Sequence, residues 1–268
     1  MEHLRCAVAE LSAASGIVDN VYDASVRAAA LAKLTEGATL SAVSRQTGIN
    51  RATLRSWLAN PTPKARISSC PMCHDEPFPP RRAYVYLLGM YLGDGCICQL
   101  ARTMSLRITC ADAYPLVMDE CARAISAVTG RTVGRVPNVG CTDLVSYWQH
   151  WACLFPQHGR GRKHERAIAL ADWQHDLVCV DPRPLIRGLL HSDGSRFDNV
   201  VHRPLPTGVR TYSYPRYMLT NNAADILRIF TDALDLLGIA WRQNRWNSIS
   251  VARREAVAAL DEFVGPKY

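Results

Sequence analysis

The sequence lacks the features that mark secreted proteins, membrane proteins and zinc proteases. It opens with MEHLRCAVAELSAASG, which has no basic segment before an apolar core, so we expect no secretory signal. No apolar run approaches the ~20 residues that a membrane span needs. The eight histidines show no HExxH spacing. We therefore expect a soluble, cytoplasmic protein whose ten cysteines are mostly reduced.

Acidic residues are fewer than basic ones. The 268-residue chain has 24 Asp and Glu against 31 Lys and Arg, a net charge of +7, which is compatible with a polyanionic partner. Arginines cluster in His158–Arg166 and again in Trp241–Glu255. Solvated loops and strand faces also carry such clusters, so charge alone leaves both interpretations open.

The segment Val26–Leu58 has the layout of a helix-turn-helix. A helix over about Leu40–Thr47 is followed by a tight turn at Gly48, and Asn50 caps a further helix over Arg51–Leu58. We predict a helix-turn-helix domain over residues 1–59, similar to those of bacterial invertases, resolvases and many regulators. A helical packing or dimerisation module is the alternative.

The last of these helices has two distinct faces. Leu54, Trp57 and Leu58 follow the i, i+3, i+4 spacing of one buried face. The opposite face lies near the end of the helix that enters the major groove in such modules. Its predicted DNA-binding residues are Arg51, Thr53 and Arg55.

Residues 60–83 read as a linker, because they hold six of the fifteen prolines. Cys70 and Cys73 within it form a CxxC, which is half of a zinc site. No second CxxC follows, but the fold could bring in Cys141, Cys153 or His158. The alternatives are a Zn²⁺ ion with ligands from elsewhere or two reduced thiols in a turn.

The rest of the chain contains an internal repeat. LLGMYLGDG (Leu87–Gly95) recurs as IRGLLHSDG (Ile186–Gly194), which places Asp94 and Asp193 99 residues apart. Each copy is followed by two strands, an amphipathic helix ending at a glycine, and further strand and helix patterns. We predict two αββαββα repeats over 84–180 and 181–268, with about twelve extra residues in the first hairpin of the second.

The two helices that carry the aspartates are largely apolar, so each should be buried, and we expect them to pack on one another. Gly89 and Gly93 lie on one face, and Gly188 and Ser192 repeat that spacing. Small residues at i and i+4 let helix backbones approach closely. Close approach would set the two aspartates side by side.

These paired segments resemble the motifs of LAGLIDADG homing endonucleases in the single-chain, pseudo-symmetric form. Leu88 and Arg187 depart from the family's small second residue, and Leu92 and His191 replace its usual acid at the sixth place. The resemblance implies an α+β fold in which two sheets form a DNA-binding saddle, on a monomer with internal pseudo-two-fold symmetry.

The resemblance also implies a divalent metal site at the floor of the saddle. Asp94 and Asp193 would bind Mg²⁺, with backbone oxygens from Gly93 and Ser192, because paired carboxylates need a cation to stay ionised. Lys163 is the expected basic side chain near the scissile phosphate. The activity implied is sequence-specific, Mg²⁺-dependent cleavage of double-stranded DNA.

The remaining predicted DNA contacts are arginines of the sheets and of the loop between repeats. A protein of this kind would be associated with the nucleoid. Two alternatives stay open: a transcription regulator on the same scaffold that no longer cuts, and an RNA-splicing maturase. The predicted contacts are Arg102, Arg107, Arg160, Arg162, Arg216, Arg242 and Arg245.

Overall fold

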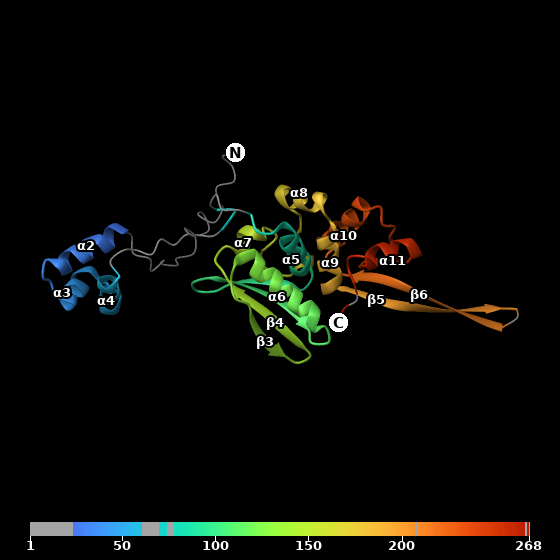
Figure 1. Cartoon of the computed structure of the whole chain (residues 1–268), viewed down its shortest axis with the longest axis horizontal. Coiled ribbons are helices and arrows are strands. Elements are labelled where there is room, and N and C mark those ends of the chain that lie inside the picture. The colour runs from blue at the N-terminus through green and yellow to red at the C-terminus, as the bar shows by residue number, and fades with distance from the viewer. Residues whose placement is uncertain (1–23, 61–69, 74–77, 207, 266, 268) are drawn as a thin grey trace. The chain divides into compact units, whose positions relative to one another are not determined.

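The structure, a computed structural model, describes residues 24–60, 70–73, 78–206, 208–265 and 267 (Figure 1). The chain divides into two compact units between Ser68 and Ser69. The parts of the expected helix-turn-helix domain and linker in 1–23, 61–69 and 74–77 lie outside the described residues. Among the described helices, none combines the length and the apolar character that crossing a membrane requires.

The first unit contains three helices, α2 (Ala24–Thr35), α3 (Leu40–Thr47) and α4 (Arg51–Ala59). Gly48 ends α3 in the left-handed region at φ 73°, which glycine adopts without steric cost. Asn50 caps α4 by accepting a hydrogen bond from the Ala52 amide, as its sequence position predicts.

The core of this unit is small, and one predicted member is absent from it. Leu54 is fully buried and Trp57 is partly buried, with the Arg27 guanidinium 5.4 Å from its ring centroid. Leu58 is 43% exposed, so the prediction that it shares the buried face is wrong. It lies in the last turn of α4, beyond the buried residues contributed by α2 and α3.

The second unit begins with the predicted first repeat. Its order is helix, two strands, helix, two strands, followed by shorter helices. The elements are α5 (Arg81–Asp94), β1 (Gly95–Gln99), β2 (Met104–Ala111), α6 (Pro115–Thr129), β3 (Gly134–Asn138), β4 (Cys141–Tyr147), α7 (Trp151–Leu154), the 3₁₀ turn η1 (Lys163–Glu165) and α8 (Asp172–Val180).

The second repeat has the same order, and each repeat forms one antiparallel four-stranded sheet. The strand orders are β1-β2-β4-β3 and β5-β6-β8-β7, which confirms two copies of one α+β topology. The elements are α9 (Arg183–Ser192), β5 (Gly194–Leu205), β6 (Gly208–Thr220), α10 (Ala224–Leu236), β7 (Arg242–Arg245), β8 (Ser248–Val251) and α11 (Arg254–Asp261).

Helices α5 and α9 pack directly on one another at the centre of this unit. A Cβ atom added to Gly188 would lie 2.3 Å from the Tyr86 carbonyl oxygen and 2.9 Å from the Gly89 Cα. A Cβ atom on Gly93 would lie 2.1 Å from the Ser192 hydroxyl oxygen. The helix backbones therefore touch at the small residues that the sequence singles out.

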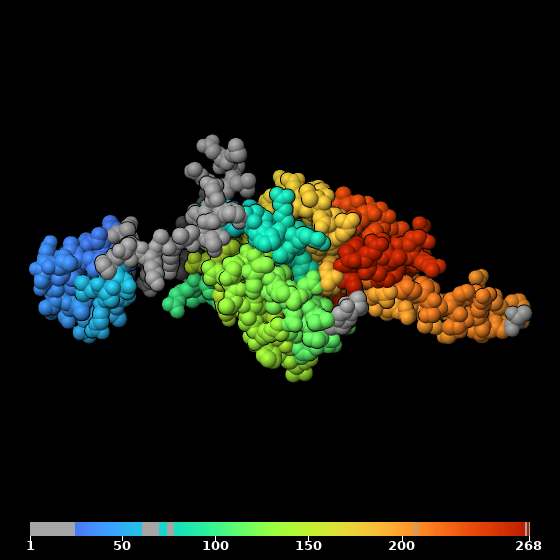
Figure 2. Space-filling model, viewed as in Figure 1, coloured from blue at the N-terminus to red at the C-terminus, as the bar shows by residue number. Residues whose placement is uncertain are grey.

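The extra residues of the second repeat lengthen its first hairpin. β5 and β6 pair over twelve positions, whereas β1 and β2 pair over five. β8 joins β6 only at Tyr217–Thr220, so most of the hairpin is a two-stranded ribbon. Figures 1 and 2 show it projecting from the rest of the repeat as a narrow arm.

Gly188→Ala tests the helix contact. Because the new methyl group would meet backbone atoms that cannot rotate away, we expect a loss of about 3 kcal/mol in unfolding free energy by denaturant titration. Gly134→Ala is the control, since its Cβ atom would lie 3.6 Å from the Val145 carbonyl oxygen. Equal stability of the two variants would contradict the close contact.

Candidate functional site

The two aspartates meet where α5 and α9 end. Asp94 is the last residue of α5, Asp193 caps the end of α9, and a Cβ atom on Gly93 would lie 3.2 Å from the Asp193 Oδ2. Asp94 as a whole residue is exposed. Even so, desolvation of its carboxyl group, followed by the charge of Asp193, raises the pKa of Asp94 to about 6. The site therefore favours a neutralising cation.

The two acids have different surroundings. The Asn221 side-chain amide donates a 2.6 Å hydrogen bond to the Asp193 Oδ2. Burial raises the pKa of Asp193, while this hydrogen bond opposes the rise by favouring the ionised form. Sequence reasoning missed Asn221, although it comes directly after the strand that carries Thr220.

Lys163, the residue predicted to lie near the scissile phosphate, reaches the end of α5. Its Nζ donates hydrogen bonds to the carbonyl oxygens of Tyr91, Leu92 and Gly93, the last two at 3.0 and 2.8 Å. Burial lowers the pKa of Lys163 to about 8, while the charges of Asp193 and Asp94 oppose that change. At neutral pH the lysine is therefore still mostly protonated.

Lys267 holds the equivalent place at the end of α9, and sequence reasoning missed it. Its Nζ donates to the carbonyl oxygens of Ser192 and Gly194, at 3.1 and 2.5 Å. Burial lowers the pKa of Lys267, and the charges of Asp94 and Asp193 oppose the shift.

A sequence signal for this lysine exists. The first repeat continues with Gly161-Arg-Lys163 and the second ends with Gly265-Pro-Lys267. Both glycines are left-handed, with φ of 80° and 68°. Each glycine lies two residues before the lysine that reaches the helix end of its own repeat, so comparing the repeats would have paired the two lysines.

The predicted backbone ligands are also at this point. The carbonyl oxygens of Gly93 and Ser192 accept hydrogen bonds from Lys163 and Lys267. Each of these oxygens uses one lone pair to bind a lysine ammonium group. Its second lone pair is available to a metal ion.

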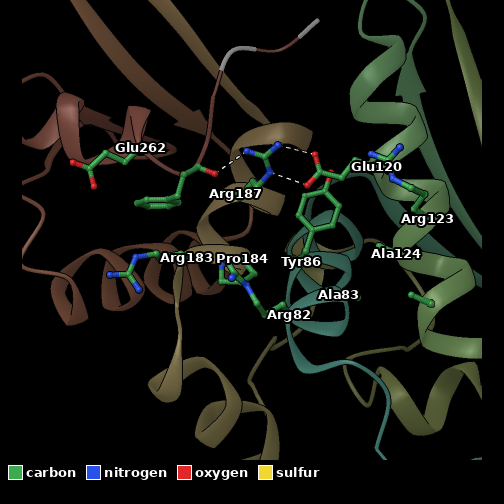
Figure 3. Close-up of a pocket in the computed structure, with 12 residues that line it drawn as sticks. Arg82, Ala83, Tyr86, Glu120, Arg123, Ala124, Arg183, Pro184, Arg187 and Glu262 are labelled. Atoms are coloured by element: carbon green, nitrogen blue, oxygen red, sulfur yellow. Dashed lines mark hydrogen bonds and ion pairs between the residues drawn. The ribbon is translucent and has the colours of Figure 1, made fainter.

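A cavity of about 370 Å³ opens beside Asp193 and Gly93, the residue before Asp94, and is lined mainly by polar groups. A second hollow, of about 530 Å³, lies near the start of α5 and α9 and contains none of the predicted site residues (Figure 3). The lining of the first matches the chemistry of the acids, and we place the site there. Its residues are Gly93, Lys163, His164, Asp193, Thr220, Asn221 and Asn222.

The departures from the family motif have structural roles away from the acids. Arg187 donates to both oxygens of Glu120 on α6, at 2.8 and 2.7 Å, and to the Phe263 carbonyl oxygen (Figure 3). It thereby ties the second repeat's central helix to the first repeat. His191 is buried against Tyr86, with 3.1 Å between its Nδ1 and the tyrosine hydroxyl.

Because His191 is buried, we expect the unfolding free energy to depend on pH. Burial, followed by the charge of Arg187, lowers the pKa of His191 to about 4, and the charge of Glu120 opposes this shift. The unfolded chain takes up this proton more readily, so folding stability is lost as pH falls from about 6.5 towards about 4. At pH 5 this amounts to about 2 kcal/mol.

His191→Gln removes the titrating group but keeps a hydrogen-bonding side chain. Its unfolding free energy should fall about 2 kcal/mol less than that of the wild type between pH 7.5 and pH 5. His202→Gln, on the exposed hairpin, is the control. Parallel pH curves for the wild type and His191→Gln would contradict this role.

Four predicted arginines lie on the sheet faces that the helices leave uncovered. In the first sheet Ile108 and Leu144 pair on the buried face, whereas Arg107 pairs with Val145 on the other. In the second sheet, Leu219 and Ile249 mark the buried face. The alternation of strand residues places Arg216, Arg242 and Arg245 opposite to it.

The projecting hairpin carries a pair of arginines, Arg203 and Arg210, on the side away from α11. Arg196 and Tyr217 pair across the strands and both bond Asp261 of α11, which marks the helix side. Arg203 and Arg210 face each other on the other side, where two like charges repel. A polyanionic partner would relieve the repulsion between the paired arginines and would stabilise this two-stranded ribbon.

The other predicted contacts are solvent-accessible. Arg102 lies in the exposed turn between β1 and β2, and Arg160 and Arg162 are exposed before η1. In the first unit Arg51 and Arg55 are exposed on α4, and Thr53 is half-buried.

Cys70 and Cys73 come together with two residues from the region of α7. His150 and Cys153 complete a group whose ligand atoms all lie within 4.8 Å of one another. Of the residues that the sequence left open, the structure therefore selects Cys153 and leaves out Cys141 and His158. His150 was missed.

No protein-family model and no curated protein matches this chain. Among solved structures, I-DmoI in complex with DNA and Ca is similar at 16% identity and a TM-score of 0.45, covering 68% of this chain and 89% of that chain. The I-LtrWI LAGLIDADG homing endonuclease bound to target DNA is similar at 8% identity and a TM-score of 0.45, covering 69% and 84%.

A third solved structure is the LAGLIDADG meganuclease I-AabMI bound to uncleaved DNA. It is similar at 9% identity and a TM-score of 0.43, and the match covers 67% of this chain and 82% of that chain. The family that the paired motifs of this chain resemble, the LAGLIDADG homing endonucleases, is the family that these structures name.

Proposed function

We propose that this protein is a Mg²⁺-dependent, sequence-specific endonuclease of double-stranded DNA with an added helix-turn-helix. The observation that carries the proposal is the meeting of Asp94 and Asp193 at the ends of two helices in backbone contact. Two carboxylates held together beside carbonyl oxygens form the oxygen-rich, negative site that Mg²⁺ prefers.

The residues present fit such an ion. Asp94 and Asp193 would hold it, with backbone oxygens of Gly93 and Ser192 as further donors. Bound there, Mg²⁺ supplies an activated water and stabilises the leaving 3′-oxygen of the phosphodiester. The raised pKa of Asp94 supports the same conclusion, because burial of its carboxyl group and the charge of Asp193 outweigh the opposing charges of Lys163 and Lys267.

The two lysines supply one cation to each repeat. Each ammonium group is held at the helix end of its own repeat, beside the aspartate of that repeat. In that position Lys163 and Lys267 neutralise charge on the acids and on a phosphate that enters the cavity. We infer that each repeat acts on one DNA strand, with one acid and one lysine.

The two sheets would hold the DNA on their uncovered faces. Arg107, Arg216, Arg242 and Arg245 lie there, and Arg107 is positioned by Asp143, 3.5 Å away. The long hairpin extends this surface in the second repeat alone. We therefore propose that the target is asymmetric, with a longer contacted half on the side of β5 and β6.

The test is cleavage of a randomised duplex library with Mg²⁺. The wild type should cut a recurring site, and Asp94→Asn and Asp193→Asn should each lose double-strand cleavage by at least about 100-fold while still binding. Asp232→Asn, exposed on α10, is the control.

A wild type that selects one site but does not cut it in the presence of any divalent metal would contradict the proposal. The protein would then be a non-cleaving regulator, and the aspartates would be ordinary helix ends. Selection of RNA over DNA would favour a maturase instead.

The hairpin arginines give a separate prediction. The double variant Arg203→Gln, Arg210→Gln should bind the selected site more weakly and lower the slope of log affinity against log salt by about 2, one for each lost cation. Fluorescence anisotropy over a salt series measures both quantities.

Arg135→Gln, which removes one arginine charge elsewhere, provides the control for this experiment. Arg135 lies on the helix side of β3, where it forms an ion pair with Asp119 of α6. Its loss should leave the salt slope unchanged. An unchanged slope in the double variant would show that the arm does not contact DNA.

A further inference from the structure

The cysteine–histidine group joins two short segments far apart in the chain. Cys70 and Cys73 come from the start of the second unit, and His150 and Cys153 come from the beginning of α7. Both pairs have the spacing i, i+3. Each is closed by a backbone hydrogen bond, from Cys73 N to Cys70 O at 3.2 Å and from Cys153 N to His150 O at 3.0 Å. Two single turns thus present two ligands each.

Three of the four ligand atoms are spaced like the edges of a tetrahedron, and the Cys70 Sγ lies within 4.8 Å of each of them. Cys73 Sγ lies 3.5 Å from Cys153 Sγ and 3.5 Å from His150 Nδ1, and Cys153 Sγ lies 3.8 Å from the same nitrogen. For bonds of about 2.3 Å to sulfur and 2.0–2.1 Å to nitrogen, the edges of a tetrahedral zinc site are about 3.5–3.8 Å. The four atoms need little movement to bind one ion.

The group is built into the protein rather than scattered on its surface. Cys70 is fully buried, Cys73 and Cys153 pack against the core of the second unit, and the His150 ring lies 5.4 Å from that of Trp148. Three thiols and an imidazole converging at one point are the ligands of structural zinc.

We propose that Cys70, Cys73, His150 and Cys153 bind one structural Zn²⁺ ion. The set has four protein ligands and leaves no position for water or substrate, which separates it from a catalytic zinc site. It contains neither of the aspartates proposed to cut DNA, so it is a second, independent metal site of different chemistry.

The consequence of this site is a link between the start of the second unit and α7. With zinc bound, Cys70 and Cys73 would be tied to His150 and Cys153. Without zinc, that link is lost.

The experiment uses the full-length protein, purified under reducing conditions. Mass spectrometry of metal content should find one zinc per chain. After exchange, Co²⁺ should give the visible spectrum of tetrahedral thiolate coordination. Cys73→Ser and Cys153→Ser should lose the zinc, whereas Cys141→Ser, an equal change outside the group, should keep it.

His150→Cys is a control that separates loss of a metal ligand from misfolding of the variant. It should retain one metal ion, and its Co²⁺ derivative should gain thiolate charge-transfer absorption because a fourth sulfur replaces the imidazole. Chelation should lower the melting temperature of the wild type and leave that of Cys153→Ser unchanged.

Three results would overturn the proposal. They are a folded wild type without zinc, zinc equally retained by Cys73→Ser and Cys153→Ser, and a disulfide within the group in reducing buffer. Each is independent of DNA cleavage, so the zinc site and the nuclease can fail separately.

Discussion

The rest of the second unit depends on the contact between α5 and α9. Gly89 and Gly188 let the two backbones touch, and a single added methyl group at Gly188 would overlap a carbonyl oxygen. This contact fixes the relative position of the repeats, and with it the position of every element that each repeat carries. Arg187, in the middle of α9, also ties that helix to Glu120 on α6 of the first repeat.

The contact between α5 and α9 also brings negative charges together, which is electrostatically unfavourable. Asp94 and Asp193 come together at helix ends, where the backbone dipole is also negative. Lys163 and Lys267 offset this charge by bonding the last carbonyl oxygens of each helix. The two lysines neutralise the carboxylates only in part. A divalent ion bound there would supply the remaining positive charge.

Each repeat places one aspartate and one lysine at the end of its central helix, but the repeats differ in their other features. Asn221 stabilises the charge of Asp193, and the long β5–β6 ribbon extends only the second repeat. The first repeat instead carries the cysteine–histidine group near α7. The pseudo-symmetric centre therefore lies within an asymmetric molecule, as an asymmetric DNA target would require.

The sequence by itself determined the repeat, the order of its elements, the glycines of the helix contact and the two acids, because each follows from local spacing and periodicity. It also located Cys70 and Cys73 as half of a site. Only the tertiary structure decided that His150 and Cys153 lie beside Cys70 and Cys73, and that His191 turns into the core. Lys267, in contrast, could have been paired with Lys163 by comparing the repeats. Contacts between residues about 80 or more positions apart depend on how whole elements pack, and no local pattern in the chain records that packing.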